Sequence, residues 1–192
     1  MTRQARARGG PPGEVRLIGG LWKRSKLPVI DRPGLRPTPD RVRETLFNWL
    51  GQDLTGWRVL DAFAGSGALG FEAASRGAAE VLLLERDTLL SRSLADVKAR
   101  LKADAVKIVG ADALAWLSRC TPGRFELVLI DPPFDADVFD AALAAAAPAV
   151  VAGGYVYLEA PRGIDSAPAG FTLHRHLRAG AVHAHLFVRE QG

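Results

Sequence analysis

VLDAFAGSGALG, residues 59–70, joins the end of an apolar strand to the start of a helix through a glycine-rich turn. Gly65, Gly67 and Gly70 match the pattern G-x-G-x-x-G, in which glycines allow a tight turn and let the backbone pass close to a ligand. Because such a loop follows the first strand of many open parallel sheets, the stretch predicts an α/β fold with a ligand site at the strand ends. A dinucleotide is one candidate ligand, and a tight turn that binds nothing is the alternative.

Acidic residues around this loop favour a different ligand, S-adenosylmethionine. Asp61 and Phe63 precede the glycines, and a carboxylate there suits an ammonium and a sulfonium better than a pyrophosphate. Glu85 follows Gly65 by twenty residues and ends the run VLLLE, where a carboxylate can accept both ribose hydroxyls. An ordinary solvated acid is the alternative for Glu85, and Asp112 can either meet the adenine amino group or cap a helix. The predicted cofactor-binding residues of this region are Asp61, Phe63, Ala64, Gly65, Ser66, Gly67, Glu85 and Asp112.

Beyond Gly56 the sequence alternates strand-like and helix-like segments. We expect strands at 58–62, 80–85, 105–109, 125–130 and 154–160, and helices near 67–76, 87–102, 111–118 and 136–150. This alternation predicts a parallel sheet with helices on both faces. The segment FTLHRHLRAGAVHAHLFVRE (171–190) alternates with a period of two around Ala179-Gly180, which predicts an antiparallel hairpin. Together the elements predict a seven-stranded, mostly parallel Rossmann-like sheet of the class I methyltransferase type.

The N-terminal part carries an excess of positive charge. Residues 1–43 hold eleven Lys and Arg residues against three acids, whereas the remaining 149 residues have a net charge of −4. A basic segment on a mildly acidic body is typical of a protein that binds a phosphate backbone, and a solvated tail is the alternative. Trp22 within the basic run favours a folded arm. We therefore expect a disordered basic tail at 1–13, an RNA-binding arm with a short β-hairpin and a capping helix at 14–50, and a methyltransferase domain at 51–192.

LVLIDPPFD, residues 127–135, ends a buried strand with an acid, two prolines and an aromatic residue. An exocyclic amine is a poor nucleophile because its lone pair is delocalised into the base. The Asp131 carboxylate on one N–H and the Pro132 carbonyl on the other can localise that pair, and Pro133 keeps the loop rigid. Phe134 offers a face on which an extruded base can stack. The stretch therefore predicts Asp131, Pro132, Pro133 and Phe134 as catalytic residues, with a proline-rich turn as the alternative.

The motifs together resemble the RsmD family of 16S ribosomal RNA guanine-N2 methyltransferases. The resemblance is carried by RLIGGLWKRSKLP (16–28), PGLRPTPDRVRETLFNWL (33–50), LDAFAGSGALGFEAASRGA (60–78) and IDPPF (130–134). It implies methyl transfer from S-adenosylmethionine to N2 of one guanine, guanine 966 of 16S ribosomal RNA, within the small subunit or its assembly intermediate. It also implies that the segment 36–50 packs over the methionine end of the cofactor.

That last implication makes Thr38 a cofactor contact and makes Arg36 and Arg41 contacts to cofactor or RNA. The residues themselves indicate Thr38 as the N-cap of the capping helix and Pro39 as its first helical residue. The RNA-binding residues that we expect are Arg16, Trp22, Lys23, Arg24, Lys26, Arg36 and Arg41.

Composition argues against several other classes. A single cysteine, Cys120, rules out a disulfide framework and predicts a reducing, cytoplasmic environment. No apolar run has membrane-spanning length, so we expect no membrane partner, and we also expect a monomer. Cys120 lies in SRCTP, away from DPPF, which disfavours a cytosine-C5 enzyme with a cysteine nucleophile. An adenine-N6 DNA methyltransferase would use the same loop and clamp, but only about 50 N-terminal residues remain for reading base edges. A non-catalytic RNA-binding module on the same fold is a further alternative.

Four histidines occupy the C-terminal hairpin. If Ala179-Gly180 is a two-residue turn, His174 pairs with His185 and His176 with His183, and all four share one face opposite apolar residues such as Phe171 and Leu173. A metal site, an RNA contact and a plain polar face are the three interpretations. Because methyl transfer from a sulfonium needs no Lewis acid, we expect no metal.

Overall fold

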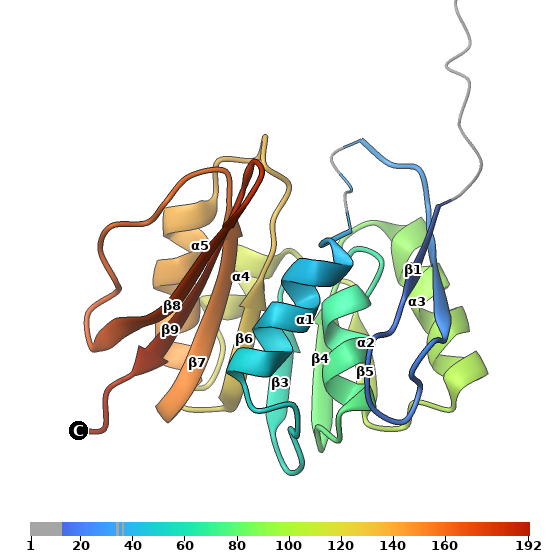
Figure 1. Ribbon diagram of the computed structural model, residues 1–192, viewed down its shortest axis with the longest axis horizontal. Helices are drawn as coiled ribbons and strands as arrows, with labels where there is room; N and C mark the ends of the chain where they lie inside the picture. Colours follow the sequence, from blue (N-terminus) through green and yellow to red (C-terminus); the bar gives the residue numbers. More distant parts are fainter. Residues whose placement is uncertain (1–12, 34, 36) are drawn as a thin grey trace, which may run out of the picture.

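A computed structural model describes residues 13–33, 35 and 37–192 of the chain (Figure 1). Its centre is a seven-stranded sheet with the order β5-β4-β3-β6-β7-β9-β8. The strands are β3 (Arg58–Asp61), β4 (Glu80–Leu84), β5 (Val106–Val109), β6 (Phe125–Ile130), β7 (Val150–Ala160), β8 (Phe171–Ala179) and β9 (Val182–Arg189). The first five pair in parallel, whereas β9 pairs antiparallel with both β7 and β8. The predicted Rossmann-like sheet with an antiparallel C-terminal hairpin is thereby confirmed.

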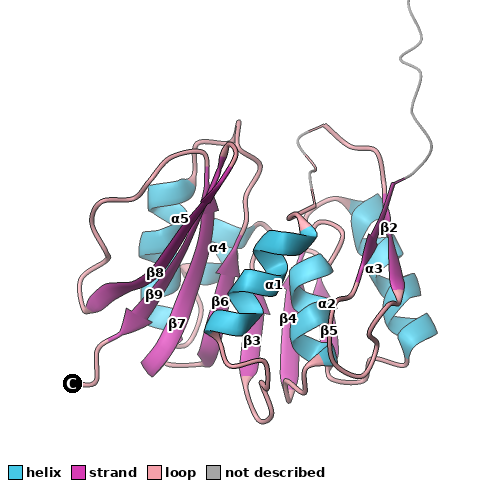
Figure 2. Cartoon of the chain, viewed as in Figure 1, coloured by secondary structure: helices cyan, strands magenta, loops and turns pink. Residues whose placement is uncertain are grey.

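Helices cover the parallel part of the sheet on both faces (Figure 2). One face carries α1 (Asp40–Trp49), α2 (Ala68–Ser75) and α3 (Thr88–Leu101), and the other carries α4 (Ala113–Leu117), α5 (Phe139–Ala146) and the 3₁₀ turn η1 (Ala147–Ala149). Alternate residues of β6 divide between the two cores, since Leu127 and Leu129 pack toward the first face and Val128 and Ile130 toward the second. This two-sided burial explains why the central strands read as continuous apolar runs.

The start of α1 differs from the expectation. Pro39 is the N-cap and makes no side-chain capping bond, so the prediction that Thr38 caps this helix was wrong. The Thr38 hydroxyl instead donates to Asp131 Oδ2 at 3.0 Å. The Thr38 side chain, which the local sequence predicts as a helix cap, is therefore hydrogen-bonded to a residue that follows β6 and is distant in the sequence.

The basic arm forms the predicted hairpin, in which β1 (Gly13–Arg16) pairs antiparallel with β2 (Lys26–Val29). Residues 1–12 of the expected tail lie outside the described residues, while Gly13 already belongs to β1. The hairpin packs on α2, where Glu72 accepts the backbone N–H groups of Ile18 and Gly19 at 2.8 Å each. The arm is thus attached to the helix that follows the glycine-rich loop.

Arg43 connects this arm to α1. Its side chain is fully buried. The guanidinium donates to the carbonyl oxygens of Arg16 and Thr38 and forms ion pairs with Asp40 and with the buried Glu72. A buried cation with this many acceptors is satisfied, and it fixes the segment that leads into α1.

The C-terminal hairpin has a different register from the predicted one. Ala179 pairs with Val182, so the turn lies one residue later than assumed, and the register shifts again at His174. As a result His176 pairs with His185, and His183 lies opposite Arg178. Leu173 pairs with Phe187 on the same side of the sheet as His185, not opposite the histidines. The extra residue on β8 moves Leu173 to the face of the histidines, which the alternating pattern alone cannot reveal, while His176, His183 and His185 share one face as predicted.

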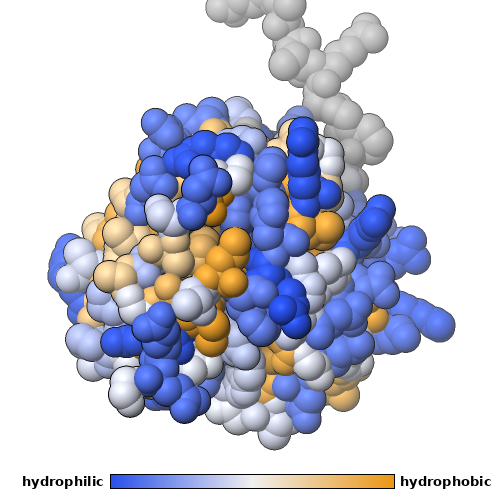
Figure 3. Space-filling view, turned by 60° about the vertical axis from the view of Figure 1, so that its left-hand side comes forward, coloured by the Kyte–Doolittle hydropathy of each residue, from blue (hydrophilic) through white to orange (hydrophobic). Residues whose placement is uncertain are grey.

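Most large apolar side chains are inside the molecule. Among the described residues the large hydrophobic side chains that remain exposed are Leu21, Leu89 and Leu173. The space-filling view brings the side with the antiparallel strands forward and shows apolar areas bordered by hydrophilic residues (Figure 3). No helix in the described part of the chain combines the length and the apolar character needed to cross a bilayer.

Candidate functional site

A cavity of about 390 Å³ opens where the parallel strands end. This is the position at which open α/β sheets bind ligands, because the loops after several strands converge there. The predicted residues that line it are Thr38, Asp61, Phe63, Ala64, Gly65, Ser66, Glu85, Asp112, Asp131, Pro132, Pro133 and Phe134. One cavity therefore collects both the cofactor-binding and the catalytic candidates.

Gly67 is the predicted cofactor residue that does not line this cavity. It is the N-cap of α2 with φ of 78°, and a Cβ there would lie 2.6 Å from the Phe71 ring and 2.7 Å from Leu94. Gly70 is constrained in the same way, because a Cβ would lie 2.2 Å from Leu83. These two glycines allow α2 to pack closely on its neighbours, so their place in the motif reflects packing.

Asp61 lies at the floor of the cavity with 1% of its surface exposed. Oδ2 accepts the Gly70 N–H at 3.0 Å, whereas Oδ1 is buried and accepts no well-formed hydrogen bond within the described chain. Burial raises the pKa of this carboxyl to about 7, opposed by the Gly70 and Phe63 N–H groups and reinforced by the charge of Glu85. A buried carboxylate oxygen that lines a cavity and has no well-formed hydrogen bond within the described chain suits a cationic ligand.

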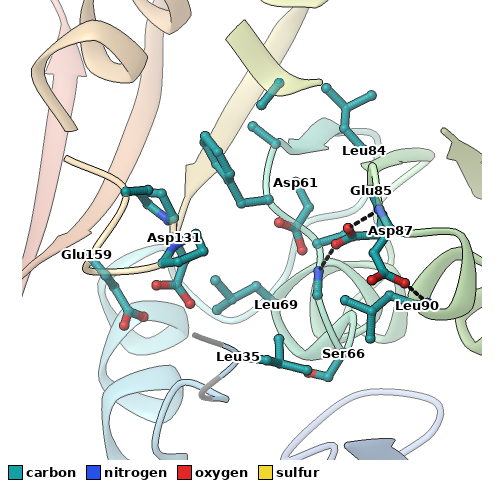
Figure 4. A pocket seen from close by; sticks show the side chains of 18 of the residues that line it. Leu35, Asp61, Ser66, Leu69, Leu84, Glu85, Asp87, Leu90, Asp131 and Glu159 are labelled. Carbon is teal, nitrogen blue, oxygen red and sulfur yellow. Dashed lines mark hydrogen bonds between the residues drawn. The ribbon is translucent and has the colours of Figure 1, made fainter. Parts of the chain in front are cut away.

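Glu85 is fixed by the loops on either side of it (Figure 4). Its Oε2 accepts the Gly65 N–H at 3.0 Å and its Oε1 accepts the Asp87 N–H at 2.8 Å. Each carboxylate oxygen has a second lone pair, so a pair of hydroxyl donors can bind without displacing the backbone. Asp87 in turn caps α3 by accepting the N–H groups of Leu89 and Leu90.

Asp112 has the capping role that the sequence left open. Its Oδ1 accepts the Ala115 N–H at 3.0 Å, which makes it the N-cap of α4. Because the same residue lines the cavity, capping and a ligand contact are compatible.

The opposite end of the cavity is formed by the loop after β6. The Phe134 ring packs edge-on against Phe139, with ring centroids 6.1 Å apart, and Pro132 is buried. The Asp131 carboxylate accepts a hydrogen bond from the Thr38 hydroxyl. Cys120 lies beyond α4 and does not line this cavity, and burial raises the pKa of its thiol, so its position does not suit a cytosine-C5 nucleophile.

Glu159 is a cavity residue that the sequence interpretation missed. It lies near the end of β7, is 2% exposed and accepts the Tyr157 hydroxyl at 2.8 Å. Burial raises the pKa of this carboxyl, while hydrogen bonds from Tyr157 and Thr38 and the charge of Arg43 act in the opposite direction. The sequence did contain a signal for this residue. Glu159 follows the apolar run VYL in the same way that Asp61, Glu85 and Asp131 follow theirs.

The RNA-binding candidates that the structure describes lie on the arm and on α1, and none of these described residues lines the cavity. Lys23 and Arg24 lie in the loop between β1 and β2, whose Leu21 and Trp22 N–H groups donate to Ser75 at the far end of α2. Trp22 packs partly against the core. Lys26 pairs with Glu14 at 2.7 Å. The remaining candidates are Arg16 and Arg41, which are exposed, and Arg36, which lies outside the described residues.

Three of the four histidines form a stack. His176 Nε2 and His183 Nδ1 are 3.1 Å apart, and the candidate ligand atoms of His176, His183 and His185 lie within 4.8 Å of one another. However, His185 Nε2 accepts the Ile164 N–H at 3.0 Å and its Nδ1 lies 3.3 Å from the Leu158 carbonyl oxygen. Both nitrogens of His185 are engaged by the backbone, which favours a structural stack over a three-histidine metal site.

The chain is similar to known proteins over nearly all of its length. A family model described as Conserved hypothetical protein 95 matches residues 15–188. The Ribosomal RNA small subunit methyltransferase D of Escherichia coli is 43% identical over 186 residues, which cover 93% of this chain and 91% of that protein. A solved Escherichia coli structure described as a candidate methyltransferase has 38% identity and a TM-score of 0.83 over 93% of this chain and 99% of that chain. A solved candidate methylase from Haemophilus influenzae has 33% identity and a TM-score of 0.79 over 93% of this chain and 100% of that chain.

Proposed function

Since the chain belongs to the RsmD family of ribosomal RNA small subunit methyltransferases, we propose that it methylates the exocyclic N2 of a guanine in that RNA, with S-adenosylmethionine as methyl donor. The observation that carries the proposal is the convergence of the glycine-rich loop, its partner acids and the DPPF loop on one cavity. The names of the relatives support ribosomal RNA as the substrate and methyl transfer as the reaction.

The cavity residues fit S-adenosylmethionine, which supplies a methyl group activated by a sulfonium. Asp61 Oδ1 would accept from the ammonium of its methionine part, because this buried oxygen has an unused acceptor site. Glu85, held by two backbone N–H groups, would accept the ribose hydroxyls. Phe63 and Asp112 would contact the adenine, and Thr38, Ala64, Gly65 and Ser66 would complete the site.

The DPPF loop would bind and activate the target amine. Asp131, oriented by Thr38, would accept one N2–H, and the Pro132 carbonyl would accept the other. Accepting both protons favours a lone pair localised on nitrogen, which is what attack on a methyl group requires. Pro133 restricts the loop, and Phe134, positioned by Phe139, would stack on the extruded base.

The arm would hold the RNA backbone. We propose Arg16, Trp22, Lys23, Arg24, Lys26, Arg36 and Arg41 as contacts to ribosomal RNA within the small subunit or its assembly intermediate. Lys26 should contribute less than its neighbours because Glu14 already offsets its charge.

Mass spectrometry of nucleosides tests the proposal directly. Small-subunit RNA from cells with and without the gene should differ in N2-methylguanosine, and a plasmid copy should restore the wild-type level. A copy carrying Asp131→Ala serves as the matched control and should not restore it. An unchanged N2-methylguanosine level on loss of the gene would refute the proposed function.

A further inference from the structure

Two carboxylates face the same end of the cavity from neighbouring strands (Figure 4). In the register of β6 and β7, Ile130 pairs with Leu158, so Asp131 and Glu159 follow as the next residues of the two strands. Neighbouring strands lie about 4.8 Å apart, so this register brings both side chains to the same part of the cavity. The Asp131 carboxylate has a use in the proposed chemistry, whereas the Glu159 carboxylate has none so far.

The Thr38 hydroxyl interacts with both Asp131 and Glu159. Thr38 donates to Asp131 Oδ2 at 3.0 Å and also interacts with Glu159, but a hydroxyl has a single proton to donate. The other donor to Glu159 is the neutral Tyr157 hydroxyl. Glu159 is buried, and the hydroxyl donors described for it, Tyr157 and the shared Thr38, satisfy only part of its acceptor capacity, so a ligand N–H group would suit it.

Guanine presents such N–H groups along one edge. Its N1–H lies beside its N2 amino group, so one edge offers three N–H bonds in a plane. Adenine differs at this point, because its N1 is an acceptor that an ionised carboxylate would repel. The proposed DPPF contacts are made to an exocyclic amine, which both guanine and adenine carry, so they do not distinguish the two bases.

We propose that Glu159 determines base specificity by accepting the N1–H of guanine while Asp131 and the Pro132 carbonyl bind its N2 amino group. The inference rests on the proposed function and deepens it, because it assigns the choice of guanine over adenine to a residue outside the DPPF motif. Tyr157 and Thr38 are positioning residues that orient the carboxylate.

The test uses 2-aminopurine, which keeps the exocyclic amine of guanine but has an acceptor in place of N1–H. Small-subunit RNA is assembled from two transcripts and a synthetic segment that carries guanine or 2-aminopurine at the position methylated by the wild-type protein. After reconstitution with ribosomal proteins, kcat/KM is measured on both particles for the wild type and Glu159→Gln. Because each ratio is taken within one variant, a lowered fraction of folded protein cancels.

The wild type should prefer guanine by about 100-fold or more, since a site built around a hydrogen bond leaves buried groups unpaired when the ligand lacks it. In Glu159→Gln the amide can donate as well as accept, so the preference should fall below about tenfold. Glu126→Gln, at the other end of β6 and paired with Arg58, is the matched control and should keep the wild-type ratio. Tyr157→Phe should lower kcat/KM on guanine while keeping a strong preference.

Failure of this inference is distinct from failure of the proposed function. If the wild type forms N2-methylguanosine but Glu159→Gln retains the full preference for guanine over 2-aminopurine, Glu159 does not read N1. If the wild type forms no N2-methylguanosine at all, the proposed function fails, and the inference fails with it.

Discussion

At the scale of a single carboxyl, we expect Asp61 to couple ligand binding to pH. Burial raises the pKa of Asp61 to about 7, so this carboxyl titrates near neutral pH in the free protein. A ligand ammonium requires the carboxylate, so the affinity for S-adenosylmethionine should rise up to tenfold per pH unit below pH 7. Above about pH 8 it should fall again as the α-amino group of the ligand deprotonates.

Calorimetric titration between pH 5.5 and 9 measures this profile. Asp61→Asn should weaken binding by about tenfold or more and remove the rise below pH 7, because the amide has neither a charge nor a titration in this range. A wild-type affinity that is flat from pH 5.5 to 7 would place the ammonium elsewhere.

Asp131 should contribute mainly to the transition state. Asp131→Ala should lower the single-turnover rate by about 100-fold or more, the usual effect of losing one preorganised electrostatic contact, while affinity for S-adenosylmethionine stays near wild type. Asp131→Asn should be milder because the amide oxygen still accepts one hydrogen bond. Full activity of Asp131→Ala on small subunits that lack the modification would contradict the proposed clamp.

His185 gives the fold a dependence on pH that is independent of the cavity. Burial lowers the pKa of His185 to about 4, with the charges of His176 and His183 acting in the same direction and the Leu158 carbonyl opposing. In the unfolded chain a histidine protonates below about pH 6.5. The stability that the neutral ring contributes is therefore fully present above pH 6.5 and lost as the pH falls toward 4, by on the order of 1 kcal/mol per pH unit.

Urea unfolding of wild type and His185→Gln between pH 4 and 7 isolates this contribution. The difference between the two unfolding free energies should shrink as the pH falls, because Gln keeps an acceptor for Ile164 without titrating. Asp61 acts in the opposite direction over part of this range, since its raised pKa stabilises the fold at lower pH, but its effect is common to both proteins. A difference that does not vary with pH would contradict the assignment.

At the scale of elements, Glu72 of α2 links the arm, α1 and α2 through hydrogen bonds and ion pairs. It accepts two N–H groups of the arm, pairs with Arg76 on its own helix and faces Arg43 of α1. Glu72→Gln would leave two buried guanidinium groups without a full counter-charge, and should cost about 3 to 5 kcal/mol of unfolding free energy. Glu80→Gln, which breaks partly exposed pairs with Lys107 and Arg124, is the control and should cost less than about 1 kcal/mol. Similar losses in urea titrations of the two variants would contradict the anchoring role.

Local chemistry predicted the central elements because buried parallel strands and their loops are specified by contiguous residues. The apolar run before Asp131 and the glycines after Asp61 could be assigned without knowledge of the residues that they contact in the fold. Thr38 and the hairpin register were misjudged because distant residues decide them: Asp131 accepts the Thr38 hydroxyl, and an irregularity at His174 changes the pairing. Glu159 was overlooked although the same strand-end pattern applied to it.

For the whole molecule, charge distribution predicts how binding responds to salt. If the arm follows phosphates, each lost contact should reduce the slope of log affinity against log salt by about 0.7 to 0.9. Lys23→Ala and Arg24→Ala together should then lower the slope by about twice that amount, and Lys26→Ala by less. Filter binding of small subunits across a salt series measures the slopes, with Arg119→Ala, beyond α4, as the control. An unaltered slope in the double variant would return Lys23 and Arg24 to a solvated surface.

The junction of arm and α2 has a consequence for how the polypeptide is made. During synthesis the arm emerges before α2, because the Glu72 carboxylate that accepts the Ile18 and Gly19 N–H groups lies 54 and 53 residues further along the chain. The hairpin cannot settle until α2 has left the exit tunnel, so both should fold in one late cooperative event. A shortened chain that starts after the arm would expose Glu72 and would remove the hydrogen bond from Arg43 to the Arg16 carbonyl oxygen. Such a truncation would destabilise the helix that follows the glycine-rich loop, so its inactivity would say nothing about RNA binding.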